Sequence, residues 1–294
     1  MRYYLQFLIF VLYLLFMMVS CNHNKTAFDV QGHRGCRGLM PENSLPAFKK
    51  AIDLGVTTLE LDIAVTKDQQ LIITHEPFVN PLICITHDGR TIPDSLDQAY
   101  NIYQMSYEAI KNFDCGSKKL QDFPNQKKLK THKPLLKELF DLVHHLNADV
   151  KFNIELKSKP EYYGKYTPFP KPYVALVKNE IEASGFANKI SLQSFDLAIL
   201  EEVNQQIPNT TIVLLVDENA SIAARLHQLS FKPDVISPYF KLLNKENISY
   251  YQGLNYEIIP WTVNKKEDMN QLISWGVNGI ITDYPNLLLS LTNK

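Results

Sequence analysis

The sequence predicts a single (β/α)8 barrel domain, also called a TIM barrel. Eight apolar runs of strand length follow one another from residue 28 to the C-terminus, and segments with helical periodicity lie between them. This alternation predicts parallel strands joined by crossover helices. The length of 294 residues, 45% of them hydrophobic, suits either two ordinary domains or one barrel, and eight such units favour the closed barrel.

The eight expected strands are short apolar runs of four to seven residues. In chain order they cover 28–33, 57–63, 150–156, 189–193, 211–216, 234–237, 257–263 and 278–282. In a (β/α)8 barrel the C-terminal ends of the strands meet at one face, and active sites lie there. The titratable residues discussed below fall at or just past these ends, so we expect the site at that face.

The expected helices lie between these strands, and several have start and stop signals. Asn43 or Ser44 can cap the first helix, and four helices are followed by a glycine, namely Gly55, Gly185, Gly253 and Gly276. The helices are expected at 44–54, 135–146, 173–184, 197–206, 220–229, 242–252 and 265–275, with a short tail from residue 285.

One apolar run, 71–75, does not fit the repeat. A short polar tip separates it from the strand at 57–63, which predicts a β-hairpin extension after the second strand. If the hairpin folds about Asp68, His75 lies roughly across from Asp62, and directly opposed residues have Cβ atoms about 4.5–5.5 Å apart. The hairpin therefore returns His75 to the catalytic end of the second strand.

The stretch from about residue 77 to 133 is a second exception, because it is long and polar with one plausible short helix at 106–113. Loops of this length are usually functional or are small inserted subdomains. It leaves from the catalytic end, so we expect a cap over the pocket. Cys84 and Cys115 within it could form a disulfide in an oxidising compartment, or they could remain unpaired thiols together with Cys36.

The first 21 residues resemble an export signal. Arg2 precedes an uncharged apolar run at 7–19, which ends in Ser20-Cys21. A cysteine placed there resembles the bacterial lipoprotein signal, in which that cysteine becomes the lipidated first residue. The alternative is an uncleaved membrane anchor. Either way, we expect the domain at 22–294 to lie in the cell envelope, tethered to a membrane.

The balance of charge argues against a nucleic-acid partner. The chain has 30 basic and 31 acidic residues, a formal net charge of -1, and both signs are mixed along the sequence. Nucleic-acid binders usually concentrate basic residues in a patch or stripe, so we expect a small-molecule substrate instead.

Three carboxylates are candidates for a metal site. Glu60 and Asp62 stand two residues apart on one expected strand, so both point to the same face, and Glu155 lies on the next strand of the barrel. Buried carboxylates without a partner are costly, and all-oxygen ligation suits one Mg²⁺ or Ca²⁺ ion better than zinc. The alternative is ion pairing with Arg34 or Lys157 without a metal.

Two histidines converge on these carboxylates. His33 and His75 each end an expected strand, as a general acid and base pair would require. Arg34 and Lys157 add positive charge suited to the oxygens of a phosphate group. Together with a cation, these residues predict cleavage of a phosphate ester.

The residues at these positions resemble the signature of the glycerophosphodiester phosphodiesterases. The N-terminal blocks are His33-Arg34-Gly35, Pro41-Glu42-Asn43-Ser44, Glu60-Leu61-Asp62 and Thr74-His75-Glu76. Later blocks resemble the family in the same order, namely Asn153-Ile154-Glu155-Leu156-Lys157, Ser194-Phe195-Asp196, Trp261-Thr262-Val263-Asn264 and Gly279-Ile280-Ile281-Thr282-Asp283-Tyr284-Pro285. The resemblance covers nearly everything after the signal segment.

This resemblance implies the same barrel with an insertion after the second histidine. It assigns catalysis to the two histidines, one divalent cation to the three carboxylates, and the phosphate to Arg34 and Lys157. Trp261 would form an apolar wall of the pocket, although an aromatic residue at a strand end is as often plain packing. The chain departs from the family pattern at Glu76, where aspartate is usual, at Cys36-Arg37 beside the first histidine, and at Gln69 in place of glycine.

The function implied is metal-dependent hydrolysis of glycerophosphodiesters to glycerol 3-phosphate and an alcohol. In that family the substrate's own hydroxyl can attack phosphorus to give a cyclic intermediate, which is then hydrolysed. The sequence does not decide which histidine acts as the base. Two alternatives stay open: a related barrel phospholipase that acts on intact lipids, and a lipoprotein that binds phosphodiesters without catalysis.

Overall fold

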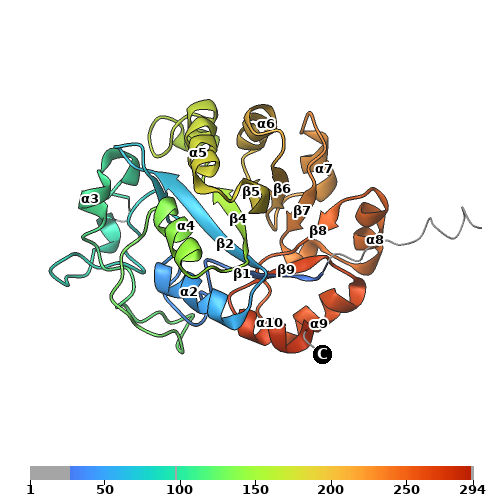
Figure 1. Cartoon of the computed structure of the whole chain (residues 1–294), viewed down its shortest axis with the longest axis horizontal. Coiled ribbons are helices and arrows are strands. Elements are labelled where there is room, and N and C mark those ends of the chain that lie inside the picture. Colours follow the sequence, from blue (N-terminus) through green and yellow to red (C-terminus); the bar gives the residue numbers. More distant parts are fainter. Residues whose placement is uncertain (1–26, 97, 293–294) are drawn as a thin grey trace, which may run out of the picture.

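The computed structural model describes residues 27–96 and 98–292, and this part of the chain forms the expected barrel (Figure 1). Eight parallel strands stand in the order β8-β7-β6-β5-β4-β2-β1-β9, and the helices surround them. The expected signal segment at 1–21, including Cys21, lies outside the described residues. No helix within the described ranges combines the length and apolar character needed to cross a membrane.

All eight expected strands are present, although four are shorter than expected: β1, β4 and β9 by one or two residues, and β8 by five. Their bounds are β1 Asp29–Gly32, β2 Thr58–Val65, β4 Lys151–Leu156, β5 Ile190–Ser194, β6 Thr211–Val216, β7 Val235–Pro238, β8 Glu257–Ile258 and β9 Gly279–Thr282. β8 stops well before residue 263 because Pro260 has no N–H to donate to the ladder. Backbone hydrogen bonds still close the barrel, from Asn278 N to Ile258 O at 2.9 Å and from Val263 N to Ile281 O at 3.0 Å.

The helices confirm most of the predicted positions. Their bounds are α2 Leu45–Leu54, α3 Tyr107–Ile110, α4 Leu136–His145, α5 Pro170–Ser184, α6 Leu197–Gln206, α7 Ile222–His227, α8 Lys245–Gly253, α9 Lys266–Trp275 and α10 Pro285–Thr292. Short 3-10 turns are η1 Asp94–Leu96, η2 Ile102–Gln104, η3 Pro160–Tyr162, η4 Ala187–Lys189 and η5 Phe240–Leu242. α5 begins three residues before the expected start, because proline is favoured in the first turn of a helix.

The capping predictions are right at three of the four glycines. Ser44 caps α2, where its side chain accepts a hydrogen bond from the backbone N–H of Ala47. The three other predicted glycines end their helices in the left-handed conformation, at positions 55, 185 and 276. The prediction for Gly253 is wrong. Gly253 is the last residue of α8, and Asn255 takes the left-handed conformation instead, with φ 59°.

The hairpin is present, but its register differs from the predicted one by one residue. β3 (Leu71–Ile73) pairs with β2 in antiparallel fashion, with Ile63 opposite Ile73. Thr74, rather than His75, therefore lies across from Asp62, and the Thr74 N–H donates to the Asp62 carbonyl at 2.9 Å. His75 is the next residue, after the strand has ended. At the hairpin tip Gln69 adopts φ 59°, the conformation for which glycine is better suited.

The insertion at 77–133 is a compact subdomain packed beside the hairpin. Apolar residues of the insertion and of the hairpin form a small core of their own, which includes Val79, Ile102 and Ile110. The expected helix at 106–113 is reduced to the single turn of α3. A disulfide joins Cys84 to Cys115, so the bridged alternative holds, and Cys36 is a buried free thiol.

Candidate active site

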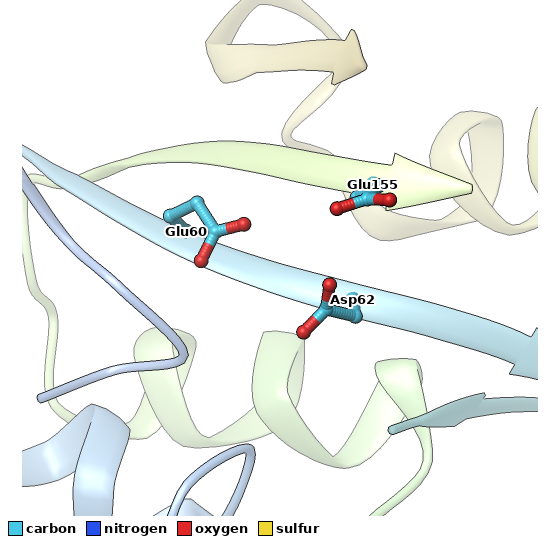
Figure 2. A group of neighbouring side chains, drawn as sticks. All are labelled: Glu60, Asp62 and Glu155. Atoms are coloured by element: carbon cyan, nitrogen blue, oxygen red, sulfur yellow. The ribbon is translucent and has the colours of Figure 1, made fainter. Parts of the chain in front are cut away.

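The three predicted carboxylates meet inside the barrel at its C-terminal end (Figure 2). Glu60 and Asp62 project from β2, and Glu155 projects from β4 directly beside Asp62 in the parallel register. One oxygen of each lies within 4.8 Å of the others, and their exposed fractions are 2%, 1% and 7%. The same-face spacing on β2 and the β2–β4 pairing are what bring three negative charges together in a buried place.

The ionisation of the three carboxylates shows how much charge the site must balance. Burial raises the pKa of Glu60 well above its ordinary range, and the neighbouring Asp62 adds to this effect. Burial also raises the pKa of Glu155 to about 7, although Lys157 acts in the opposite direction. At Asp62 burial acts to raise the pKa, but Arg34, His75, Lys157 and His33 together outweigh it and hold the pKa of that carboxyl far below its usual range.

Ion pairs balance only part of this charge. Arg34 Nε lies 3.3 Å from Asp62 Oδ2, and Lys157 Nζ lies 2.7 Å from Glu155 Oε1. Within the described residues no side-chain nitrogen of Lys, Arg or His lies within 4.0 Å of a Glu60 oxygen. Its two hydrogen-bond donors are neutral, the Arg34 backbone N–H at 2.8 Å and Gln193 Nε2 at 2.8 Å. An all-oxygen cluster with one carboxylate lacking a cationic partner fits a hard divalent cation, Mg²⁺ or Ca²⁺.

The raised pKa of Glu155 predicts how metal-free protein responds to pH. Its pKa is about 7 in the folded protein and 4.5 ordinarily, so its contribution to stability is complete below about 4.5 and is lost as the pH rises through 7. From pH 5 to pH 8 in chelator, this group should lower the free energy of unfolding by an amount on the order of 3 kcal/mol.

Urea denaturation of the wild type and of Glu155→Gln at both pH values measures this effect. The variant should lose less stability on going to pH 8, because its amide does not ionise. An identical pH dependence in the two proteins would contradict the prediction.

Each predicted histidine is held by a carboxylate. His33 Nδ1 lies 2.6 Å from Asp283 Oδ1, and His75 Nδ1 lies 2.7 Å from Glu76 Oε1. When Nδ1 carries the proton and donates it to the carboxylate, Nε2 of each ring is left for proton transfer. Asp283 is itself fixed by Asn264 Nδ2, which donates to Oδ2 at 2.7 Å.

Asp283 belongs to the candidate site, and the sequence did not predict its contact with His33. It lies one residue past β9, and β9 pairs with β1 so that Thr282 stands beside Gly32. Closure of the barrel thus places the residue after each strand, Asp283 and His33, side by side. The predicted barrel could have indicated this contact, because the first and last strands of a (β/α)8 barrel are neighbours and the residues that follow them lie close together.

A second set of supporting residues comes from the loop before α2. Glu42 Oε1 accepts a hydrogen bond from Arg34 Nη1 at 2.9 Å, and its other oxygen lies 2.8 Å from Arg37 Nε. Although burial acts to raise it, the pKa of Glu42 is lowered to about 2, mainly by Arg34. Asn43 Nδ2 donates to Asp62 Oδ2 at 2.8 Å. These contacts fix the arginine and one carboxylate of the site.

Six of the eight predicted site residues line one pocket of about 240 Å³ at the C-terminal end of the barrel. They are His33, Arg34, Glu60, His75, Glu155 and Trp261. Asp62 and Lys157 do not line this pocket, but they form ion pairs with Arg34 and Glu155, which do. Trp261 packs edge-on against Phe195, with ring centroids 5.5 Å apart, and its Nε1 donates to Ser237 O at 3.0 Å. The structure therefore brings all the predicted residues together, including the apolar wall.

Comparisons with known proteins agree on one family. Residues 33–287 match the model of the glycerophosphoryl diester phosphodiesterase family. A glycerophosphodiester phosphodiesterase of Caldanaerobacter subterraneus subsp. tengcongensis is 31% identical over 269 residues, which are 90% of this chain and 98% of that protein. The matched range contains every predicted site residue.

Solved structures have the same fold. A crystal structure from Silicibacter pomeroyi DSS-3, assigned to the glycerophosphoryl diester phosphodiesterases, superimposes with a TM-score of 0.81 at 27% identity, covering 91% of this chain and 94% of that one. A phosphodiesterase from Oleispira antarctica, in complex with the product sn-glycerol-3-phosphate, has a TM-score of 0.72 at 20% identity, covering 90% and 97%. At that identity the second likeness concerns the fold alone.

Proposed function

Because the chain belongs to the glycerophosphoryl diester phosphodiesterase family and is an enzyme of that class, we propose that it uses one divalent cation and two histidines to split glycerophosphodiesters. The products are glycerol 3-phosphate and an alcohol. The observation that carries the proposal is the meeting of two histidine–carboxylate pairs and three buried carboxylates around one pocket.

Glu60, Asp62 and Glu155 would hold the cation. A Mg²⁺ or Ca²⁺ ion held there would supply Lewis-acid chemistry, polarising the phosphate and balancing the charge on its oxygens. Arg34 and Lys157 stand beside the same carboxylates and extend the positive field toward the phosphate. Their own contacts with Asp62 and Glu155 hold them in place, so little ordering remains to be done when the substrate binds.

The two histidines have different surroundings, which suggests their roles. Burial lowers the pKa of His75, and the nearby charges of Arg34 and Lys157 lower it further. A neutral His75 at neutral pH can take the proton from the attacking hydroxyl, either that of a water molecule or that of the substrate's own glycerol. Glu76 orients the ring through its Nδ1.

His33 is placed to supply the other proton. The buried carboxylate of Asp283, 2.6 Å from Nδ1, holds the ring in a fixed orientation. His33 would then donate its Nε2 proton to the oxygen of the departing alcohol, and that transfer makes the alcohol a neutral leaving group. The two protons thus move on separate rings, each held by its own carboxylate.

Identification of the products by ³¹P nuclear magnetic resonance tests this proposal. The substrates are glycerophosphoglycerol, glycerophosphocholine and glycerophosphoethanolamine, each with Mg²⁺ or Ca²⁺. We expect the signal of glycerol 3-phosphate to grow with every substrate that is cleaved. Release of phosphocholine or phosphoethanolamine would place the cut on the wrong side of phosphorus, and no turnover on any diester would favour the non-catalytic binding protein.

The location of the enzyme in the cell envelope is part of the same proposal. The sequence at residues 1–21 supports export and lipidation at Cys21. The disulfide between Cys84 and Cys115 also suits an oxidising compartment outside the cytoplasm. Mass spectrometry of the membrane fraction would detect a lipid-modified Cys21, and an intact N-terminus on a cytoplasmic protein would contradict this location.

A further inference from the structure

A second pocket of about 640 Å³ opens directly from the catalytic one. Arg34, Arg37 and His75 line both, so the two spaces meet at the catalytic residues. The barrel forms one side of this outer pocket. The insertion forms the other, with Lys118, Lys119 and neighbouring apolar side chains.

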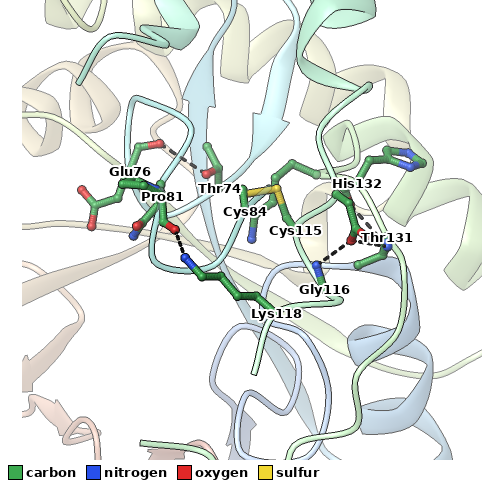
Figure 3. The surroundings of a disulfide bond; sticks show 12 residues. Thr74, Glu76, Pro81, Cys84, Cys115, Gly116, Lys118, Thr131 and His132 are labelled. Atoms are coloured by element: carbon green, nitrogen blue, oxygen red, sulfur yellow. Dashed lines mark hydrogen bonds between the residues drawn. A yellow bond between two sulfur atoms is a disulfide. The ribbon is translucent and has the colours of Figure 1, made fainter. Parts of the chain in front are cut away.

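Two links within the insertion stabilise the wall that it contributes to this pocket (Figure 3). The disulfide from Cys84 to Cys115 joins the two stretches of the insertion that face the pocket. Lys118 then reaches across from one stretch to the other, where its Nζ donates to Pro81 O at 2.5 Å. These two links hold the ammonium group of Lys118 at a fixed place on the rim.

The wall carries an excess of positive charge. Arg34 and Arg37 of the barrel side are paired with Glu42, and Glu76 is hydrogen-bonded to His75, so the wall carries four cationic side chains of Arg and Lys against three carboxylates. Lys118 and Lys119 have no carboxylate within 4.0 Å among the described residues, and the remaining acidic side chain of the wall is Asp122. An anionic group that entered this pocket would therefore meet two ammonium groups whose charge is not neutralised by direct ion pairs.

The same wall is poorly suited to a quaternary ammonium group. Such groups are bound over the faces of aromatic rings, and Phe123 is the aromatic residue that lines this pocket. The guanidinium carbon of Arg37 already lies 4.6 Å from the centroid of its ring. The site for a cation is thus filled by the protein itself, and the two lysines would repel a second cation.

We infer that the outer pocket receives the alcohol part of the diester and favours alcohols that carry a second phosphate group. This rests on the proposed function, in which phosphorus lies at the carboxylates lining the inner pocket. The smaller inner pocket then takes the glycerol common to all substrates, and the larger outer pocket takes the part that varies. Lys118 and Lys119 bind the second phosphate.

A pair of substrates that differ by one glycerophosphate group, which carries this second phosphate, tests the inference. In bis(glycerophospho)glycerol the departing alcohol carries an additional glycerophosphate, which glycerophosphoglycerol lacks. The ratio of their kcat/KM values should be well above one in the wild type. In Lys118→Gln/Lys119→Gln it should fall about tenfold, as expected for one lost charge-assisted hydrogen bond, while glycerophosphoglycerol alone changes less than about twofold.

The chain offers a matched control. Lys127 and Lys128 belong to the same basic stretch of the insertion but are exposed and lie outside the pocket wall. Lys127→Gln/Lys128→Gln removes the same net charge and should leave the ratio unchanged. The single variant Lys119→Gln should lower the ratio partially. This variant keeps the hydrogen bond from Lys118 to Pro81, so it tests the inference even if the double variant fails to fold.

Three outcomes would overturn the inference. The first is an unchanged kcat/KM ratio in the Lys118→Gln/Lys119→Gln protein. The second is an equal fall of this ratio in the Lys127→Gln/Lys128→Gln control. The third is a wild-type preference for glycerophosphocholine over both glycerophosphoglycerol and bis(glycerophospho)glycerol. In each case cleavage of glycerophosphoglycerol would leave the proposed function standing. No release of glycerol 3-phosphate from any of the three substrates would overturn the proposed function, and this inference with it.

Discussion

Replacing His33 with glutamine is expected to lower kcat for glycerophosphoglycerol by about 10²–10⁴, the usual contribution of a general acid or base. The amide of the new side chain could still donate a hydrogen bond to Asp283, but it could not deliver a proton to the departing alcohol. KM should change much less, because in the proposed mechanism binding of the phosphate depends on Arg34, Lys157 and the cation. Initial rates at saturating Mg²⁺ measure both constants.

Two further variants serve as a comparison and a control for His33→Gln. Asp283→Asn keeps the imidazole but removes the buried carboxylate that orients it at 2.6 Å, so its kcat should fall between those of the wild type and His33→Gln. His227→Gln changes an exposed histidine on α7 and should have no effect. Wild-type kcat in a folded His33→Gln protein would show that His33 transfers no proton in the reaction.

Replacing Glu60 with glutamine is expected to lower both the affinity for the divalent cation and the activity by at least about 100-fold. Changes to residues that merely support a metal ligand cost about 10–100-fold, so loss of a ligand should cost more. The size of the side chain is unchanged. The Arg34 N–H and Gln193 Nε2 donate to different oxygens of Glu60, so the single amide oxygen of glutamine can still accept from one of them. The fold should therefore survive.

The same variant has a second expected effect, of opposite sign. Burial and the neighbouring Asp62 raise the pKa of Glu60, which means that its ionised form is unfavourable without a metal. Chelator-treated Glu60→Gln should therefore melt at a higher temperature than chelator-treated wild type at pH 8, and it should gain less from added Mg²⁺ or Ca²⁺. Isothermal titration calorimetry and thermal melts measure these quantities. Metal affinity equal to that of the wild type would exclude Glu60 as a ligand.

The sequence was sufficient to predict the barrel because every barrel strand contains buried apolar residues and helices connect the strands. The i, i+2 spacing on β2 also predicted that Glu60 and Asp62 share one face. The length of β8 was misjudged, since the apolar run continues to Val263 while Pro260 interrupts the ladder. The prediction followed the apolar character of this run and did not take into account that Pro260 has no N–H to donate.

The rest of the site depends on contacts that a local pattern does not specify. Whether His75 or Thr74 faces Asp62 is decided by one residue of hairpin register, and the turn geometry at Gln69 sets that register. The bond between His33 and Asp283 joins residues 250 positions apart and exists because β9 closes against β1. The ion pair of Arg34 with Glu42 likewise requires the fold of the loop before α2.

Metal dependence is the most direct test of the proposed mechanism. Wild-type protein is treated with chelator until elemental analysis finds no bound divalent metal, and release of glycerol 3-phosphate from glycerophosphoglycerol is then followed as Mg²⁺ or Ca²⁺ is added back. We expect no turnover without metal and recovery along a saturation curve for a single site. Full turnover by the metal-free protein would contradict the proposal.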